Sequence, residues 1–473
     1  MKHLNITILL VLGVFISSCD SDFLEPAPTA AIDATTFYST EAELETGIIN
    51  MYDGIQGLNS TRSNDNHAIQ IEYYVTEMRS DNTRTKSSEG EAAQFESFSL
   101  EANNGIIDDY YRSFYNVIYR ANIVLDNLDV TSEENRGKFE GEAKFVRAYA
   151  YFNLVRLFGD IPLIDRITAP LETDIAFTRV STTVVYDLII SDLSIAIANL
   201  DNTYKTRASK AAAQALLAKV YLTQKTNYTE AQSLCESVIN SGFSLESNFK
   251  DVFYNEENNE IIFAIGFLSD DSRDSQNFSA EWLNAVGRTS GVNYVTPEVR
   301  VALDEFGGDR TAFSYRKDVL ETEQYQVVKY LPNGDENLGI SPTSSDPRLA
   351  GNDWIILRYS DVLLMHVEAI MAGSAETSSA SALSSFQQVR DRAGLTDVVS
   401  NVSKQELLDE RRVELAFENH RLFDLIRFEA ANDVLSAFSA ENNYSFSATD
   451  LLLPIPQREI NLSNGLLKQN PGY

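Results

Sequence analysis

The stretch that decides the fold is EAKFVRAYAYFNLVRLFGDIPLI, residues 142–164. Its apolar and aromatic residues follow a helical period from Glu142 to Phe158, which predicts a strong helix. Gly159 comes directly after the last periodic residue, and Pro162 stands just beyond it. This pairing is typical of a helix C-terminus, because glycine ends the helix and proline cannot continue it. The same helical periodicity dominates most of the chain.

Two other segments each contain an Ala-rich helix, a polar turn and a second helix within 34 residues. They are residues 208–241, with the turn at 224–227, and residues 361–394, with the turn at 373–378. That period and layout are typical of tetratricopeptide repeats. Since one such pair cannot bury both faces alone, the pairs are expected to stack into one core.

Four more helices extend this pattern. Helices over 142–158 and 182–200 resemble a third pair with an insertion, and helices over 41–57 and 107–128 resemble a fourth pair split by a long loop region. A last long helix is predicted from Ser403 to about Phe428. Glu406 lies three residues after Ser403, which gives a capping box at its start. The helical pattern therefore predicts a scaffold of stacked helix pairs.

Residues 70–104 and 245–351 differ from this scaffold, because they are richer in Gly, Asn, Ser, Asp and aromatic residues. They contain only short strand-like runs, at 261–267 and 325–330, and a third run follows at 354–358. Structureless loops of that length are uncommon inside a compact domain. We expect an irregular lobe on the helical scaffold, where binding surfaces usually lie.

The composition excludes some functions. The chain has 473 residues, 44% of them hydrophobic, so it has enough apolar residues for a large core. Its formal net charge of −31 argues against nucleic-acid binding, which needs Lys and Arg for phosphate contacts. The same charge disfavours polyanionic ligands.

The first residues predict a leader and an anchor. Lys2 and His3 precede a nine-residue apolar run, Ile8–Ile16, which suits a signal peptide and is far short of the ~20 residues that span a bilayer. The sequence Ile16-Ser17-Ser18-Cys19 resembles the lipobox of bacterial lipoproteins. The alternative is an ordinary secretory signal with an incidental cysteine. The richest later apolar stretch, 355–372, is interrupted by charged residues, so we expect an anchored protein that does not cross the membrane.

Six segments, in order and at the expected separations, resemble the SusD/RagB family. They are 22–25 (DFLE), 142–164, 208–222, 356–369 (ILRYSDVLLMHVEA), 408–428 (LDERRVELAFENHRLFDLIRF) and the end of the chain, LLLPIPQREI with NPGY. The resemblance implies an all-α fold with four tetratricopeptide-like helix pairs, an irregular, loop-rich ligand lobe, and a role in capturing glycans. It also implies a partner, a SusC-type TonB-dependent outer-membrane barrel, and an outer-membrane location at the cell surface.

The expected organisation follows from these segments. Residues 1–18 form a signal peptide, and residues 19–28 form a tether lipidated at Cys19. Residues 29–473 form one SusD-like domain. In it the helical repeats cover about 41–60, 105–241 and 359–430, and the irregular lobe covers about 70–104 and 245–351.

The C-terminal helix carries carboxylates and arginines at spacings of three and four, including Glu414, Glu418 and Arg421. One interpretation is a paired-carboxylate acid/base site. We favour an ion-pair network, because neighbouring arginines would hold the carboxylates ionised, whereas a general acid needs a raised pKa. No HExxH, GxSxG or phosphate-binding glycine loop occurs. We therefore expect no catalysis and no cofactor.

Other candidate groups have structural interpretations. Cys235 lies beside Leu, Val and Ile in a predicted helix and is expected to be a core residue. His366 and His420 also lie on predicted helices and are expected to be structural. Two acidic loops, near Asp270 and Asp335, have oxygen ligands for Ca²⁺ but not the spacing of a dedicated calcium loop, so we expect solvated loops and no metal.

Sugar recognition needs flat apolar faces and planar polar groups. Trp354 begins a strand-like run and is interpreted as structural, whereas Trp282 lies in a polar loop. We predict Trp282 as an exposed stacking ring, with Tyr73, Arg79, Asn82 and Tyr294 converging on it, and a neutral glucan as ligand. Two alternatives stay open: a tetratricopeptide scaffold for envelope proteins, and a peptide-binding member of the same family.

Overall fold

The computed structural model describes residues 37–473 except 63–64, 86–89, 170–171, 284–292 and 319–322. The predicted signal peptide, the tether and Cys19 lie outside the described residues. Four helix pairs form the scaffold, as the sequence predicts. They are α3 (Glu41–Gln56) with α6 (Gly105–Asp126), α7 (Glu133–Phe158) with α9 (Thr182–Asn199), α10 (Lys210–Gln224) with α11 (Tyr228–Ile239), and α14 (Tyr359–Met371) with α15 (Ala380–Arg392).

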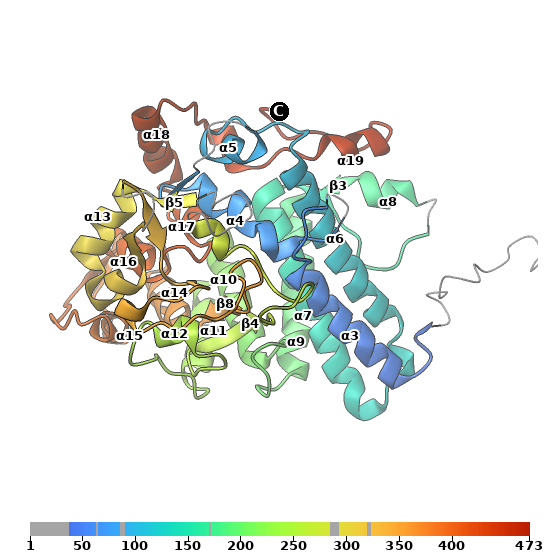
Figure 1. The fold of residues 1–473 in the computed structure, drawn as a ribbon. Coiled ribbons are helices and arrows are strands. Elements are labelled where there is room, and N and C mark those ends of the chain that lie inside the picture. Colours follow the sequence, from blue (N-terminus) through green and yellow to red (C-terminus); the bar gives the residue numbers. More distant parts are fainter. Residues whose placement is uncertain (1–36, 63–64, 86–89, 170–171, 284–292, 319–322) are drawn as a thin grey trace, which may run out of the picture.

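The pairs stack in chain order. Helix α6 packs on α7, α9 on α10, and α11 on α14, so the core is continuous from the first pair to the last. Figure 1 shows α3, α6, α7 and α9 side by side. Cys235 is fully buried in this core, which confirms its structural interpretation. By length and composition, α9 alone among the described helices is apolar enough to cross a membrane. The expectation that residues 355–372 are the richest later apolar stretch did not point to this helix.

Local signals set several boundaries. Helix α7 ends at Phe158 because Gly159 takes a left-handed φ of 70°, although the helix begins nine residues earlier than expected. The capping box at Ser403 and Glu406 is confirmed at the start of α16 (Lys404–Glu414). The predicted long C-terminal helix is wrong. The chain leaves the helix after α16 and resumes in α17 (Arg421–Arg427), because Phe417 and Asn419 between them have positive φ.

The irregular lobe contains more secondary structure than expected. Its described helices include α4 (Glu72–Val75), α5 (Glu91–Glu96), α12 (Asp251–Tyr254) and α13 (Pro297–Phe306). Its antiparallel strand pairs are β1 (Thr83–Thr85) with β5 (Asn293–Val295), β4 (Ile261–Ile265) with β8 (Trp354–Arg358), and β6 (Tyr315–Lys317) with β7 (Tyr325–Val327). Strand β8 has the predicted bounds, and Trp354 is buried in it, as expected.

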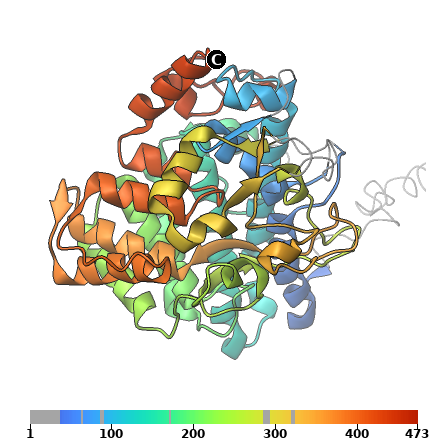
Figure 2. The same cartoon turned by 60° about the vertical axis from the view of Figure 1, so that its left-hand side comes forward.

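Smaller elements complete the fold. Two further strand pairs are β2 (Ile161–Pro162) with β3 (Arg179–Val180) and β9 (Glu376–Thr377) with β10 (Val402–Ser403). The remaining helices with α labels are α8 (Thr173–Phe177), α18 (Ala431–Asn442) and α19 (Gln457–Leu462). Figure 2 shows the C-terminal segment beside the segment near α5. There the Tyr444 hydroxyl donates to Glu96 Oε1 at 2.5 Å, which ties the chain end to the lobe.

Candidate functional site

The candidate site is a hollow of about 240 Å³ beside α4, which we call the α4 hollow. Four segments meet there. They are the loop after α3, helix α4, the start of α6, and the 3-10 helix at Ala280–Trp282. Its lining combines aromatic rings with carboxylate, amide and imidazole groups. The main lining residues are His67, Gln70, Tyr73, Tyr74, Asp109, Asn277 and Glu281. This mixture of flat faces and planar polar groups is suited to a polyhydroxylated ligand.

Several polar atoms at the hollow lack partners. Asn277 Nδ2 donates to Glu281 Oε1 at 2.6 Å, but Asn277 Oδ1 is buried without a hydrogen bond. Neither ring nitrogen of buried His67 forms a hydrogen bond with any described residue, although Nδ1 lies 3.4 Å from Asp109 Oδ2. Buried polar groups are normally satisfied, so such groups need an explanation. A ligand with hydroxyl groups in the hollow would supply the missing partners.

One wall of the hollow is a stack of aromatic rings. The ring centroids of Tyr73 and Tyr74 are 4.2 Å apart, and the Tyr73 centroid lies 6.0 Å from that of Trp282. Trp282 in turn packs 5.9 Å from Phe417, in the break between α16 and α17. Tyr73 is buried, whereas Tyr74 is half-buried and lines the hollow. Tyr74 is therefore the ring of this stack that a ligand can reach.

The structure corrects the expectation for Trp282. Stacking on a sugar requires an exposed ring, but Trp282 is only 2% exposed. Its position in a polar segment gave no sign of this, because the rings that cover it come from residues 73 and 417, which are far away in sequence. Trp282 supports the aromatic wall from behind and offers no open face.

Arg79 and Asn82 are also buried, each with 0% exposure. Arg79 donates to the carbonyl oxygens of Val75 and Asp450. Asn82 donates to Glu77 Oε1 at 3.1 Å and accepts from Arg412 Nε at 3.0 Å. The expectation that these two side chains reach an open surface is wrong, because both join the lobe to the C-terminal segment.

The two irregular regions do converge, as the sequence argument required. Strands β1 and β5 pair, with Arg84 opposite Tyr294, and Thr296 Oγ1 donates to the Asp81 carbonyl at 2.8 Å. Tyr294 is half-buried, and this burial raises the pKa of its phenol. Arg84 is held by Glu96 at 2.8 Å and by the Tyr444 hydroxyl at 2.9 Å. Tyr294 and Arg84 thus form a partly exposed edge of the same lobe.

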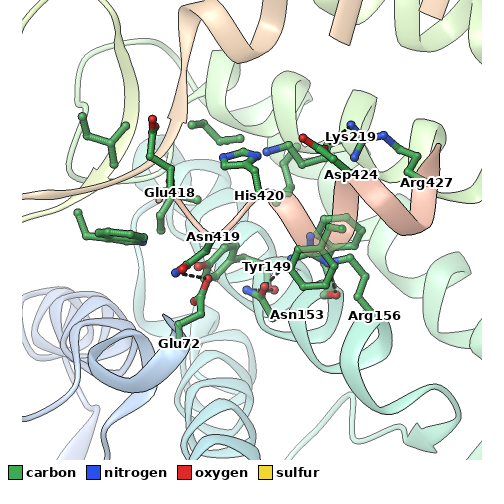
Figure 3. A pocket seen from close by; sticks show the side chains of 17 residues that line it. Glu72, Tyr149, Asn153, Arg156, Lys219, Glu418, Asn419, His420, Asp424 and Arg427 are labelled. Atoms are coloured by element: carbon green, nitrogen blue, oxygen red, sulfur yellow. Dashed lines mark hydrogen bonds and ion pairs between the residues drawn. The ribbon is translucent and has the colours of Figure 1, made fainter. Parts of the chain in front are cut away.

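A smaller cavity of about 50 Å³ lies deeper, among α7, α10 and residues 418–427 (Figure 3). Figure 3 shows Glu72, Lys219, His420 and Asp424 around it. Burial raises the pKa of Glu72 to about 7 and lowers that of His420 to about 3. A water molecule needs ~10–15 Å³ of cavity volume, so this cavity has room for a few waters but not for a sugar ring.

Glu414, the last residue of α16, and Glu418, four residues after it, form the expected ion-pair network. Buried Glu414 accepts hydrogen bonds from Arg310, Arg358 and Arg392. Burial alone would raise the pKa of Glu414, but the three guanidinium groups hold it well below its usual range. Glu418 is bound by Arg358 and Lys329, which also lower its pKa against the effect of burial. Neither carboxyl group can act as a general acid near neutral pH.

The fold is a helical-repeat scaffold whose irregular lobe carries the hollow, and comparison with known proteins gives its family. A SusD family profile matches residues 321–473, and a profile described as starch-binding associating with outer membrane matches residues 22–222. SusD-like protein P2 of Formosa agariphila is 28% identical over the full length of both chains. The starch-binding protein SusD of Bacteroides thetaiotaomicron is 24% identical over 77% of this chain and 78% of its own.

The fold agrees with these matches. A solved structure described as a laminarin binding SusD-like protein superposes with a TM-score of 0.77 and 26% identity, covering 92% of this chain and all of that one. The chain therefore belongs to the SusD/RagB family, which confirms the resemblance seen in its six segments and the helical-repeat fold that it implied.

Sequence reasoning found part of the α4 hollow. Tyr73 was predicted as a ligand residue, and it lines the hollow, although it is only 5% exposed. His67, Asp109 and Asn277 were missed. They stand in three separate segments, and the sequence signal at each is one polar residue among many.

Proposed function

We propose that this protein captures a neutral glucan at the cell surface and passes it to a SusC-type TonB-dependent barrel without cleaving it. Membership of the SusD/RagB family supports this role, and so does the likeness to a protein described as laminarin binding. The observation that carries the proposal is the α4 hollow, where an aromatic wall faces buried polar atoms that lack hydrogen bonds.

The chemistry of recognition follows from the lining. The half-buried ring of Tyr74 offers a flat face to the C–H side of a sugar ring. Asn277 Oδ1 accepts a hydrogen bond from a sugar hydroxyl, and His67 either donates or accepts according to its tautomer. A net charge of −31 disfavours polyanions, so a neutral chain is the preferred ligand.

The proposal includes no catalysis. Glycoside hydrolysis needs two carboxyl groups facing the bond, one of them protonated. Neighbouring cations hold Glu414 and Glu418 ionised inside the protein, and Glu414 is 0% exposed. A sugar bound in the α4 hollow does not reach them.

The anchor and the domain organisation are part of the proposal. Residues 1–18 are a signal peptide, Cys19 carries lipid in the outer membrane, and residues 19–28 tether one domain at 29–473. Tyr294 and Arg84, on the edge formed by β1 and β5, are further candidate glycan contacts on the same lobe. Purification in mild detergent from native cells is expected to give a complex with a large barrel. A protein that purifies alone would contradict the transporter role.

Calorimetry with neutral glucans tests the binding site. Tyr74→Ala and Asn277→Ala should each weaken binding at least tenfold, because a central ring or a buried hydrogen-bond partner contributes ~2 kcal/mol. Tyr204→Ala is the matched control, since Tyr204 is 43% exposed and does not line the α4 hollow. Circular dichroism confirms that each variant is folded.

Three results would contradict the proposal. Unchanged affinity in folded Tyr74→Ala and Asn277→Ala variants would place the ligand elsewhere. Loss of affinity confined to Tyr294→Ala would move the site to the β1–β5 edge. A wild-type protein that binds peptides but no glucan would favour the peptide-binding alternative.

A further inference from the structure

A second hollow lies across helix α6 from the first. It has a volume of about 230 Å³ and is mostly aromatic and aliphatic, and we call it the α8 cleft. Its walls come from α6, the segment after β2, α8 and the C-terminal segment. The residues that matter here are Tyr111, Tyr115, Phe177, Leu467, Arg112 and Glu459. The ring centroids of Tyr111 and Tyr115 are 4.7 Å apart, so they form one continuous aromatic surface.

The α8 cleft contains a carboxylate without a counter-ion. Among the described residues, none donates a hydrogen bond to the Glu459 carboxylate or pairs with it. Arg112 and Arg458, whose charges act on Glu459 from a distance, pair instead with Asp108, at 2.9 Å and 3.6 Å. Burial raises the pKa of Glu459, and repulsion by Asp108 adds to this. A partly desolvated carboxylate beside aromatic rings is a strong acceptor for the hydroxyl groups of a sugar.

Helix α6 connects the two hollows. Ile106 and Asp109 line the α4 hollow, whereas Tyr111, Arg112 and Tyr115 line the α8 cleft. These residues lie within three turns, so the two hollows are offset by less than ~15 Å along the helix axis. An α-helix with its side chains is ~10–12 Å across, which sets the width of the ridge between them. Figure 1 shows α4 and α8 near this end of α6.

The ridge itself is polar and partly exposed. Arg112 donates to Asp108 Oδ2 at 2.9 Å and also pairs with Asp109, so the three side chains form one cluster between the hollows. The side chains of Arg112 and Asp108 are 22% and 20% exposed. These three side chains would offer hydrogen-bonding groups to a polyhydroxylated chain that crosses α6 between the two hollows.

We propose that the α8 cleft is a second carbohydrate subsite, which holds the far part of a glycan whose first part lies in the α4 hollow. This inference rests on the proposed function. It adds that the protein selects by chain length, because only an oligosaccharide that crosses α6 fills both subsites. Two linked contacts then strengthen binding beyond either one alone.

The test compares a short and a long form of one neutral glucan by calorimetry, namely laminaribiose and laminarihexaose. In the wild type, the hexasaccharide should bind about tenfold or more tightly than the disaccharide. Phe177→Ala and Glu459→Ala should reduce hexasaccharide affinity about tenfold and leave disaccharide affinity unchanged. Helix α8 has no fully buried residue, so Phe177→Ala should leave the core intact.

The control variant is Tyr119→Ala, because Tyr119 is also on α6 but is 47% exposed and lines neither hollow. It should bind both sugars like the wild type. Unchanged hexasaccharide affinity in folded Phe177→Ala and Glu459→Ala proteins, or an equal loss for both sugars, would overturn the second subsite alone. A wild type that binds neither sugar would overturn this inference, and one that binds no other neutral glucan either would also overturn the function on which the inference rests.

Discussion

Glu414→Gln is the most informative single change in the scaffold. The substitution keeps the shape of the side chain and removes its charge. It leaves Arg310, Arg358 and Arg392 around an amide whose NH₂ group cannot accept their hydrogen bonds. All four side chains are nearly inaccessible to water, with exposed fractions between 0% and 3%. The excess positive charge is therefore poorly screened.

The expected loss of stability is large. Removing one partner from a buried ion pair typically costs ~3–5 kcal/mol, because the remaining charge stays buried without compensation. Glu260, Glu410 and Glu418 still contact the same cations, so we expect a value near the lower end, about 3 kcal/mol. The free energy of unfolding, measured by urea denaturation at pH 7, should fall by that amount.

The loss should depend on pH. The guanidinium groups of Arg392, Arg358 and Arg310 hold the folded-state pKa of Glu414 well below the usual range of a glutamate, against the effect of burial. A group with a lowered pKa contributes stability that is present above the unfolded pKa and is lost as the pH falls through the folded pKa. The difference between wild type and Glu414→Gln should therefore be greatest above about pH 5 and should shrink in more acidic solution.

The matched control is Glu305→Gln, because Glu305 is exposed and forms no ion pair among the described residues. Its free energy of unfolding should stay within ~0.5 kcal/mol of the wild type. The reasoning would be refuted if Glu414→Gln were as stable as this control at pH 7. It would also be refuted if the loss were the same at pH 4 and pH 7, since the charge would then not be its cause.

Three further predictions concern the anchor, catalysis and the inner cavity. Cys19→Ser should abolish lipidation, and external protease should remove the wild-type protein from intact cells; protection from protease would contradict surface exposure. Long incubation with a bound glucan should release no new reducing ends, and turnover that disappears in Glu414→Gln would contradict this. Glu72 has a folded pKa of about 7, so its stabilising contribution is lost as the pH rises from 4.5 through 7. Between pH 4 and pH 8, the free energy of unfolding of Glu72→Gln should therefore rise by roughly 1–3 kcal/mol relative to that of the wild type. If the difference in free energy of unfolding between the two proteins were the same at both pH values, the assigned pKa would be contradicted.

The helical scaffold could be predicted because its signals are local. The 34-residue spacing of residues 208–241 and 361–394 gave two of the helix pairs, and the apolar periodicity gave the other two. Gly159 and the capping box at Ser403 fixed helix ends within one residue. Such features depend on neighbours a few positions away, so they are visible in one sequence.

The break after α16 could not be predicted in the same way. Residues 408–428 have helical composition throughout. The chain departs from the helix where the Glu414 carbonyl accepts from Lys329 and Arg358, two cations from other parts of the lobe. Those carbonyl bonds replace the helical ones, and this competition depends on tertiary packing.

By itself, the sequence determined the stacked helix pairs, the irregular lobe, the core position of Cys235 and the family. Only the tertiary structure decided which polar and aromatic residues share a surface. It brought His67 and Asn277 to one hollow, buried Trp282 behind Tyr73, and placed Phe177 and Glu459 on the other side of α6. The physical reason is that helical period is set by contacts within a few residues, whereas the exposure of a ring is set by whichever distant segments pack against it.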